Sequence, residues 1–403
     1  MSKLSDRLLI VVFAVILLSA AIYAADTYGT SAWTSLRTLD RMDNVETWNI
    51  TAEINAAPEF GEFIRPFDGF WIDLNGLMGR ILGQREINDV YKLSNGQLTW
   101  HPAPVEFVPN IPAVIAPGVS ALTALNEFLT DNGGELLFVL APSKVSKFEN
   151  MLSAEAYDPE NLEADAFVEA LGANGVDYLD LREVFHGLGC DDYAQLFYAT
   201  DTHWRAETGA FYGYREIVRA LENYGWIAAA DPQLTDIAAF EKTTYKNFFL
   251  GYYGKRVGRY FGGTDDFVVI RPAFETFITT EIPAWNEYIE GDWYEATFID
   301  SMTAKKDYYN VSAYAAYGNS DFGYGIRRNS NAPIDKKLLV IGDSFGNVPF
   351  SLLSLIFTEV RELDMRTFNR DYRSFLAEYD PDITIVLTNV NGVYDENVKN
   401  VAP

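Results

Sequence analysis

The sequence predicts an α/β fold, a three-layer α/β/α sandwich in which a mostly parallel sheet lies between two layers of helices. Two observations support this prediction. Short apolar runs lack the period-two alternation of half-buried strands, as expected where both faces of a strand are covered. Segments of helical length separate these runs and provide the crossover connections that parallel strands need.

The predicted elements follow one another from residue 119 to residue 389. The expected strands are the apolar runs at residues 135–142, 176–181, 336–341, 360–365 and 383–389. The expected helices lie at residues 119–132, 161–175, 205–221 and 370–379. The Pro-rich stretch from Pro102 to Pro117 is expected to be a connection that leads into the first of these helices.

An apolar run, LLIVVFAVILLSAAIYAA, occupies most of residues 1–26 and follows Lys3 and Arg7. Its length approaches the roughly 20 residues that span a bilayer, and the preceding positive charge places the N-terminus in the cytoplasm. We expect a single-pass membrane anchor that holds the rest of the chain outside the cytoplasm. The small residues Ser19-Ala20-Ala21 leave a cleaved signal peptide, and therefore a secreted protein, as the alternative.

The remainder of the chain divides into two predicted parts. Residues 27–110 are expected to form a stalk and an irregular helical lead-in. Residues 111–403 are expected to form the α/β domain, with an insertion at about 226–333 that is rich in Tyr, Phe, Trp and Gly. Because aromatic residues favour strands, we expect this insertion to be a β-rich section.

Charge and composition exclude several classes of partner. The formal net charge of −26 argues against nucleic acid and against an anionic membrane surface, since both need basic patches. It leaves open a polyanionic glycan bound at a local basic site. The lone Cys190 excludes an intramolecular disulfide, and no Cys/His cluster has zinc-site spacing. The acidic pairs Asp191-Asp192 and Asp265-Asp266 predict solvated turns rather than a calcium site, so we expect no metal.

A serine stands at the end of one predicted strand, in the segment KKLLVIGDSFG. Gly342 permits a tight turn that carries Ser344, and a helix that begins near Phe345 would turn its free N–H groups toward the serine hydroxyl. Such a position suits a nucleophile. The alternative is that Ser344 only caps the helix.

A serine nucleophile needs a base, and the chain has three histidines. His101 lies in the Pro-rich connection and His186 follows a predicted strand; neither has an acidic neighbour at a useful spacing. His203 follows Asp201 by two residues, so both side chains can point to the same side of an extended backbone. Asp201 would then hold the Nδ1–H group of His203 and leave Nε2 free to accept the Ser344 proton.

A structural role for the Asp-Thr-His segment remains an alternative, in which Asp201 or Thr202 caps the following helix and His203 binds to that cap. The joint occurrence of a GDS turn, an Asp-x-His segment before a helix and few other histidines favours a Ser-His-Asp site for acyl transfer.

These motifs also resemble those of a known family. The block Gly342-Asp343-Ser344-Phe345 resembles the serine block of SGNH hydrolases, and the block Asp201-Thr202-His203-Trp204 resembles the DxHW signature of the alginate O-acetyltransferase (AlgX/AlgJ) and DHHW families. The Asp-His pair precedes the serine, which is the circularly permuted order of this group. Thr202 departs from the DHHW pattern, which has histidine there. Further similar segments, from about Val90 onward, are Gly209-Ala210, Ala141 to Lys144, Asp180 to Arg182, Gly251 to Gly258 and Leu363 to Arg366.

The resemblance implies an SGNH hydrolase-like fold and transfer of an acetyl group through Ser344 onto hydroxyls of a cell-surface or exported polysaccharide. It also implies no bound cofactor, an acetyl donor, and a membrane-bound O-acyltransferase partner that supplies the acetyl group. A carbohydrate O-acetylesterase with the same triad, or a non-catalytic glycan-binding surface protein, remains an alternative.

Several basic residues are candidates for oxyanion or substrate binding. Arg366 would assist the Ser344 backbone N–H in binding the oxyanion or would bind an acceptor carboxylate, or else pair with Asp364 or Asp371. Lys144 would contact a ligand, or else be a solvated loop residue. The aromatic insertion would form a glycan groove, or else pack as ordinary hairpins. The basic contacts expected in that groove are Lys255, Arg256 and Arg259.

Overall fold

The main sheet of the computed structural model contains eight strands among the described residues, which are 68–403 without 150, 155, 188–192 and 395. They are β5 (Glu135–Ala141), β7 (Asp177–Asp180), β10 (Ile278–Ile282), β11 (Glu287–Gly291), β12 (Tyr324–Arg328), β13 (Ile334–Gly342), β14 (Phe357–Asp364) and β15 (Ile383–Asn389). Their order is β11-β10-β12-β14-β13-β15-β5-β7. The five strands from β14 to β7 run parallel, and the other three continue the sheet in antiparallel pairing.

Both faces of β5, β15 and the second half of β13 are buried, which explains why these sequences lack alternation. In β5, Leu136, Phe138 and Leu140 face one hydrophobic cluster. Leu137 and Val139 face the other. The predicted mostly parallel three-layer sandwich is therefore confirmed.

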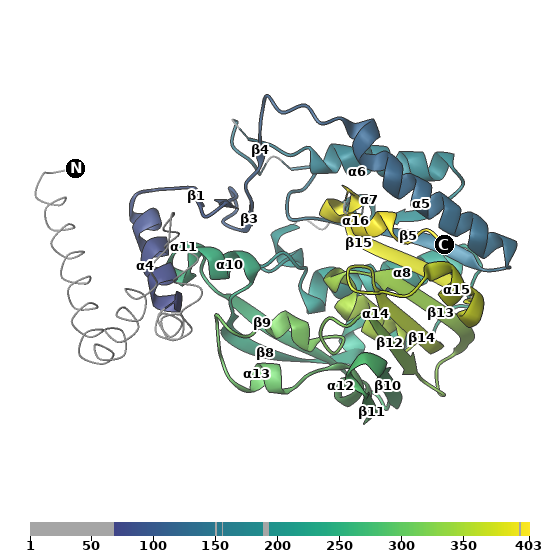
Figure 1. Cartoon of the computed structure of the whole chain (residues 1–403). Helices are drawn as coiled ribbons and strands as arrows, with labels where there is room; N and C mark the ends of the chain where they lie inside the picture. The colour runs from purple at the N-terminus through teal and green to yellow at the C-terminus, as the bar shows by residue number, and fades with distance from the viewer. Residues whose placement is uncertain (1–67, 150, 155, 188–192, 395) are drawn as a thin grey trace, which may run out of the picture. The chain divides into compact units, whose positions relative to one another are not determined.

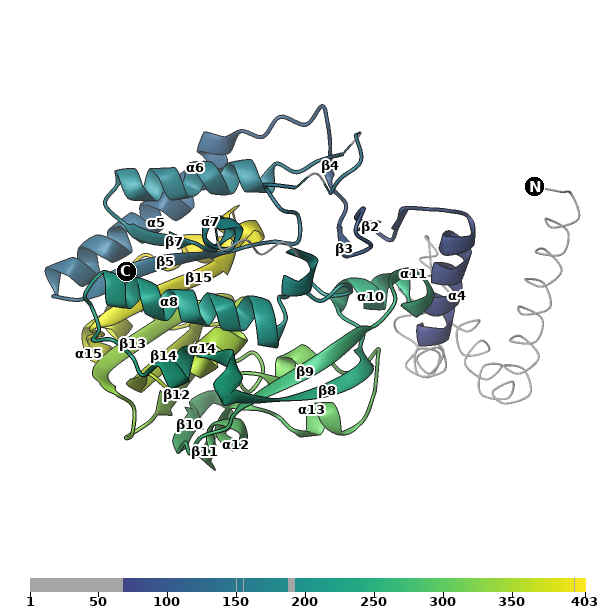
Figure 2. The same ribbon diagram turned by 180° about the vertical axis from the view of Figure 1, so that it is seen from behind.

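Helices cover the two faces as separate layers (Figure 1; Figure 2). One layer contains α5 (Ile111–Asp131), α6 (Glu160–Ala173), α15 (Tyr372–Tyr379) and α16 (Glu396–Lys399). The other contains α7 (Leu181–Gly187), α8 (Phe211–Asn223) and α14 (Asn347–Leu353). A π-helical turn, η3 (Ala206–Ala210), leads into α8.

The helix α5 begins at Ile111, earlier than the predicted start at residue 119. Pro112 is compatible with the first turn because the N–H groups there have no helical acceptor. Pro117 lies inside the helix and leaves the carbonyl group of Ala113 without its usual donor. Both residues are exposed, so water can satisfy that carbonyl group. The expectation of a Pro-rich connection up to residue 117 was therefore wrong.

Within the described part of the chain, α5 is also the helix long and apolar enough to cross a membrane. Its apolar residues Leu122, Leu125 and Leu129 are instead buried in the cluster beneath the sheet, so α5 is a core helix. The predicted anchor at residues 1–26 lies outside the described residues, as do residues 27–67 of the predicted stalk.

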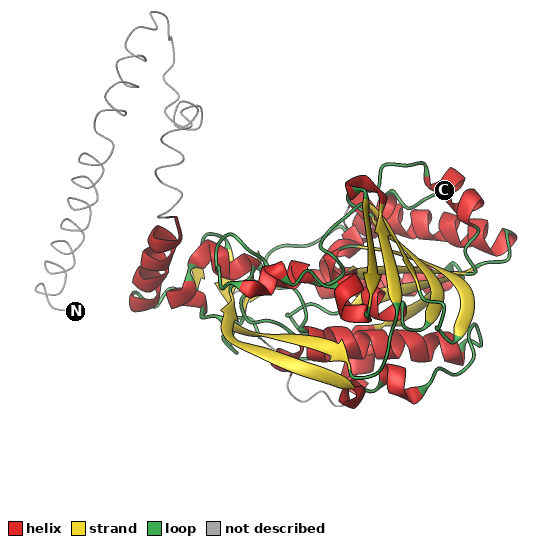
Figure 3. Cartoon of the chain, turned by 90° about the horizontal axis from the view of Figure 1, so that it is seen from below, coloured by secondary structure: helices red, strands yellow, loops and turns green. Residues whose placement is uncertain are grey.

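The aromatic-rich insertion forms the predicted β section. Two of its strands, β8 (Phe240–Phe249) and β9 (Asp265–Pro272), make an antiparallel ribbon that extends away from the main sheet (Figure 3). Three others, β10, β11 and β12, complete the antiparallel part of the main sheet. Its short helical segments are α9 (Pro232–Thr235), η4 (Ile237–Ala239), α10 (Tyr252–Val257), α11 (Arg259–Gly262), η5 (Pro283–Trp285), α12 (Trp293–Thr297), α13 (Ser301–Ala304) and η6 (Ala313–Ala316).

The segment before α5 adds small elements. They are α4 (Asp68–Ile81), β1 (Glu86–Ile87), β2 (Val90–Lys92), β3 (Leu98–Trp100) and β4 (Ala103–Pro104). Strands β1, β2 and β3 form a small sheet, and β4 pairs with β6 (Ala156–Tyr157). The Asp73 carboxylate accepts hydrogen bonds from the Arg259 backbone N–H, at 2.7 Å, and side chain, so this part is fixed to α11. The remaining turns are η2 (Tyr193–Leu196), η7 (Ser344–Gly346) and η8 (Val390–Tyr394).

Candidate active site

The sheet fixes the position of Ser344. The serine follows β13 in η7, and α14 begins three residues later. A Cβ atom on Gly342 would come within 2.8 Å of the Phe350 ring and 3.0 Å of the Leu387 carbonyl oxygen, so the turn needs glycine at this point. The Asp343 carboxylate accepts the Phe345 N–H at 2.8 Å and closes the turn. The Ser344 side chain stays partly exposed.

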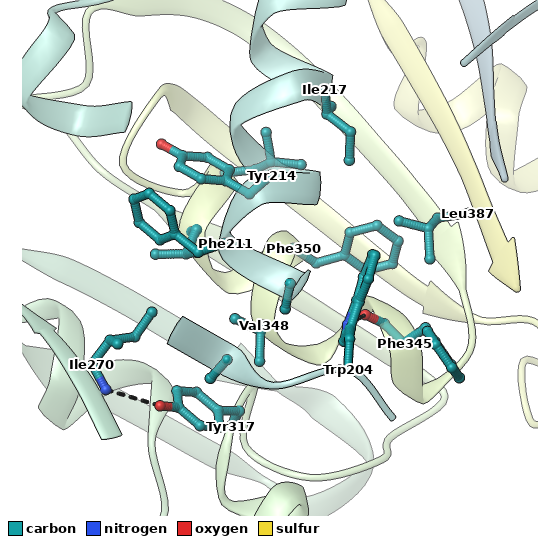
Figure 4. Packing of buried hydrophobic residues seen from close by; sticks show 14 of the residues in the cluster. Trp204, Phe211, Tyr214, Ile217, Ile270, Tyr317, Phe345, Val348, Phe350 and Leu387 are labelled. Atoms are coloured by element: carbon teal, nitrogen blue, oxygen red, sulfur yellow. Dashed lines mark hydrogen bonds between the residues drawn. The ribbon is translucent and has the colours of Figure 1, made fainter. Parts of the chain in front are cut away.

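A buried tryptophan brings the histidine segment against this turn. Phe197 and Trp204 form an antiparallel bridge. The Trp204 indole N–H donates to the Phe345 carbonyl oxygen at 3.1 Å, and its ring packs beside Phe345 and Phe350 (Figure 4). Trp204 of the DxHW block therefore joins the two motif segments.

The three side chains predicted to act together form a continuous hydrogen-bonded relay. His203 Nε2 lies 2.8 Å from Ser344 Oγ. His203 Nδ1 makes a short hydrogen bond to Asp201 Oδ1, which also accepts the His203 backbone N–H at 3.0 Å. Asp201 Oδ2 accepts the Tyr252 backbone N–H at 2.6 Å. The arrangement can pass a proton between a serine hydroxyl and an oriented imidazole.

Asp201 is held in its charged form. Burial alone would raise the pKa of its carboxyl group. The charge and ring N–H of His203, together with the backbone N–H groups of Tyr252 and His203, instead lower that pKa to about 2. A carboxylate in this state supports a positively charged imidazole beside it.

The buried Asp265 anchors the segment that precedes Asp201. Its carboxylate accepts the Ala199 N–H at 2.7 Å, the Thr200 N–H at 2.8 Å and the Thr200 hydroxyl at 2.6 Å. Arg205 donates to the same carboxylate at 3.2 Å. The sequence analysis expected a solvated turn at Asp265, but the side chain is 3% exposed. That expectation was wrong, because several donors from a distant segment compensate the cost of burying the charge.

Two other residues of the insertion contact the relay. A Cβ atom on Gly251 would overlap Asp201, so this position requires glycine for close approach. The ring of Tyr314 stacks on the imidazole of His203, with 4.0 Å between ring centroids and 16° between planes. The sequence analysis noted the resemblance of the Gly251 segment but had no signal for Tyr314.

Lys144 is neither solvated nor turned toward an open ligand site. It is 3% exposed, and its ammonium group donates to the carbonyl oxygens of Leu98 at 2.7 Å and Ala199 at 2.9 Å. Burial lowers the pKa of Lys144 to about 7, against the opposing charges of Asp265 and Asp201. Lys144 thus ties β3 and the histidine segment to the end of β5.

Arg366 pairs with acidic groups beside the serine turn. Its guanidinium binds Asp364, with Nε at 2.9 Å and Nη2 at 2.5 Å, and Nη2 also lies 3.1 Å from Asp321. Asp371 instead caps α15 through the Ser374 N–H. Of the roles considered for Arg366, the structure contains the pairing with Asp364.

The three basic residues predicted for a glycan groove lie in different environments. Lys255 Nζ donates to the Val311 carbonyl oxygen at 3.1 Å, and burial lowers its pKa. Arg259 pairs with Asp73. The guanidinium of Arg256 lies over the Trp100 ring, 4.9 Å from its centroid, and stays partly exposed.

The other two histidines have separate partners. His101 Nδ1 lies 2.7 Å from Glu86 of β1, an acidic partner that is distant in sequence. His186 stacks on Phe148 with 3.9 Å between ring centroids. The described residues contain no group of three or more His, Cys, Asp or Glu side chains arranged for a metal ion.

Part of the chain matches a known family. Residues 107–250, which include Asp201 and His203 but not Ser344, match the family model described as SGNH hydrolase-like domain, acetyltransferase AlgX. The predicted resemblance to the AlgX/AlgJ-like family is therefore confirmed. No curated protein matches the chain in sequence.

Two solved structures share the fold at low sequence identity. Bacillus cereus PatB1, solved with a sulfonyl adduct, is 19% identical with a TM-score of 0.64, over 78% of this chain and 99% of that chain. A DHHW family protein from Eubacterium siraeum is 14% identical with a TM-score of 0.53, over 77% of this chain and 97% of that chain. The chain therefore shares the fold of these structures, and its residues 107–250 resemble the SGNH hydrolase-like domain of an acetyltransferase family.

Proposed function

We propose that this chain, with its AlgX-like SGNH domain, is an extracytoplasmic O-acetyltransferase that moves an acetyl group through Ser344 onto hydroxyls of a polysaccharide. The observation that carries the proposal is the relay in which His203 Nε2 lies 2.8 Å from Ser344 Oγ while Asp201 binds Nδ1. A nucleophile, a general base and an orienting carboxylate are the groups that acyl transfer through an enzyme ester requires.

In the first half-reaction, His203 Nε2 accepts the proton of the Ser344 hydroxyl as Oγ bonds to the acetyl carbonyl carbon of the donor. The tetrahedral intermediate collapses when the bond to the donor oxygen breaks, and that oxygen takes the proton from the imidazolium. Acetyl-Ser344 remains. In the second half-reaction, a sugar hydroxyl gives its proton to Nε2 and attacks the acetyl group; the Ser344 oxygen leaves and regains the proton.

The oxyanion needs donors that are free in the resting protein. Among the described residues, the Ser344 backbone N–H has no hydrogen-bond acceptor. Arg366 uses Nε and Nη2 for Asp364 and Asp321. We therefore assign the oxyanion first to the Ser344 N–H, with Arg366 orienting the acidic groups beside the turn.

An aromatic surface beside the relay supports a sugar acceptor. Tyr252 donates its backbone N–H to Asp201, while its side chain is 50% exposed. The Trp100 ring lies 5.5 Å from the Tyr252 ring, and Arg256 lies over Trp100. Aromatic faces pack against the C–H groups of sugars, and a guanidinium binds a sugar carboxylate. This surface, formed by Trp100, Tyr252 and Arg256, is the acceptor surface.

The extracytoplasmic location rests on the apolar run at residues 1–26. The same membrane placement supports supply of the acetyl group by a membrane-bound O-acyltransferase. These parts of the proposal follow from the sequence and the family resemblance.

The test uses the full-length chain in detergent with an activated aryl acetate ester and a panel of soluble glycan oligomers. Ester cleavage and intact-protein mass are followed together. We expect an acetyl adduct on the protein and acetyl transfer to an oligomer, both absent in Ser344→Ala. Ser120→Ala, which changes an exposed serine on α5, is the matched control and should retain both. Near-normal acetyl transfer by Ser344→Ala would refute the proposal.

Two further outcomes distinguish the alternatives. Ser344-dependent release of acetate to water alone, with every glycan tested, would favour the esterase. For a transferase, Tyr252→Ala and Trp100→Ala should lower transfer to the oligomer more than ester cleavage, because the backbone N–H of residue 252 still binds Asp201. Tyr288→Ala, which removes an exposed aromatic ring on β11, should leave the ratio of acetyl transfer to ester cleavage unchanged.

A further inference from the structure

An aromatic ring lies against the proposed general base, and no motif includes it. Tyr314, in η6, stacks on the His203 imidazole with 4.0 Å between centroids. A second ring, that of Phe345, makes a tilted contact with the His203 imidazole, with 5.2 Å between ring centroids. The imidazole of His203 is thus held by two aromatic side chains, of which Tyr314 presents its face.

The hydroxyl group of Tyr314 does not explain its position. The side chain is 1% exposed. Its hydroxyl lies beside the indole N–H of Trp204, but that N–H donates to the Phe345 carbonyl oxygen at 3.1 Å and makes no regular hydrogen bond to the hydroxyl. Burying a hydroxyl with so weak a contact costs free energy. The ring also makes an edge-to-face contact with Tyr198, with 6.3 Å between centroids and 80° between planes. The contact that the position provides is therefore the face of the ring.

We propose that Tyr314 is a positioning residue that keeps the His203 ring in line with Ser344 and stabilises its imidazolium form during acetyl transfer. The proposal rests on the proposed function, because it concerns the base of that reaction. His203 becomes positively charged each time it takes a proton from Ser344 or from the acceptor. The π-electrons of a stacked aromatic face attract a cation, so the contact strengthens when the charge forms.

The stacking interaction acts together with the charges around His203. Asp201 binds Nδ1 directly, and Asp343 faces the imidazole from the serine turn. Lys144 and Lys255 interact electrostatically with Asp201. Replacing Tyr314 changes none of these charged groups. An effect on the charge of His203 can therefore be attributed to the ring.

Kinetics with two substitutions separate the ring from its hydroxyl. Tyr314→Leu keeps an apolar side chain but removes the aromatic face, and we expect kcat for Ser344-dependent ester cleavage to fall by roughly 10-fold with little change in KM, as the loss of a desolvated cation–π contact predicts. Tyr314→Phe restores the ring and should recover most of that rate. The acidic limb of the kcat/KM profile should move to lower pH in Tyr314→Leu, since the imidazolium is less favoured.

The charge of His203 can also be measured without turnover. With histidines labelled with ¹³C at Cε1, NMR follows the protonation of His203, and His101→Gln and His186→Gln assign the signals. Its titration midpoint should fall in Tyr314→Leu and return in Tyr314→Phe. The stack of His186 on Phe148 offers a matched control, because Phe148→Leu should shift the His186 midpoint and leave ester cleavage unchanged.

The outcomes separate this inference from the proposed function. If the wild-type chain shows no Ser344-dependent chemistry, the function is refuted, and the NMR midpoint alone decides the role of the ring. If the wild-type chain is active and Tyr314→Leu keeps both its rate and its His203 midpoint, the inference is refuted and the function stands. Equal losses in Tyr314→Leu and Tyr314→Phe would assign the effect to the hydroxyl group and also refute the inference.

Discussion

Gly251→Ala tests whether close packing against Asp201 sets the geometry of the relay. The backbone of Gly251 lies in the extended region, which alanine adopts without strain. The new methyl group would nevertheless stand 2.5 Å from Asp201 Cα and closer still to Cβ and Oδ2. The affected atoms include backbone, so a simple side-chain rotation cannot relieve the overlap.

The size of the effect follows from the distance. Ordinary contact begins at 3.4 Å and the nearest atom, Asp201 Cβ, would be 2.2 Å away, so Asp201 or the turn at residue 251 must move by about 1.2 Å. A misplacement of about 1 Å in a catalytic group can cost on the order of 100-fold in rate. We therefore expect kcat for ester cleavage to fall about 100-fold, while overpacking lowers the free energy of unfolding by about 1–3 kcal/mol.

The measurements are Ser344-dependent cleavage of the aryl acetate and urea unfolding, each on the full-length chain. Gly187→Ala is the matched control, because a Cβ atom there meets nothing within 4 Å and the residue is exposed. It should retain both rate and stability. Near-normal kcat in a folded Gly251→Ala variant would show that the contact between Gly251 and Asp201 does not position the relay.

Two other predictions concern the carboxylates behind the histidine. Asp265→Asn should lower the free energy of unfolding in urea by about 2–3 kcal/mol, because an NH₂ group replaces a carboxylate oxygen that accepts hydrogen bonds. The control is Asp266→Asn, which removes a surface ion pair with Lys246 and should lower the free energy of unfolding by less than about 1 kcal/mol. Equal losses in the two variants would contradict the anchoring role of Asp265. Asp201 has a pKa of about 2 against an ordinary 3.8, so it stabilises the fold by about 2 kcal/mol above pH 3.8 and loses this contribution as the pH falls toward 2. Urea unfolding between pH 5 and pH 2 should show this loss, and Asp201→Asn should weaken it; an unchanged pH dependence would contradict it.

The parallel sheet and the residues of the relay could be predicted from the sequence because both depend on local patterns. A strand buried on both faces has a continuous apolar run, and a turn at its end places Ser344 at the sheet edge. The separation of two residues between Asp201 and His203 already places both side chains on one side of the backbone. His203 and Ser344 are 141 positions apart, so the prediction that they meet rested only on the need of a serine nucleophile for a base.

The roles of the residues that support the relay, such as Asp265 and Lys144, could not be predicted. Their partners are distant in sequence, and the residues next to them show no motif that indicates burial. Asp265 has the local appearance of a polar turn, yet it binds Thr200 from 65 positions away. Lys144 follows a strand, a position at which a solvated loop lysine is expected, yet it is buried and donates to the Leu98 carbonyl oxygen of β3. In each case tertiary contacts compensate a burial cost that sequence alone predicts to be prohibitive.

The supports of the relay and the acceptor surface should affect the proposed reaction differently. The insertion contacts the relay on the Asp201 and His203 side, through Tyr252, Asp265 and Tyr314, whereas the main sheet holds the Ser344 turn. Because His203 moves the proton in both half-reactions, a change in these supports should slow formation and breakdown of acetyl-Ser344 alike. A change in the exposed rings of the acceptor surface should slow breakdown to the glycan alone. Transferase and esterase activity would therefore be set by the acceptor surface rather than by the relay, which serves water and sugar hydroxyls equally.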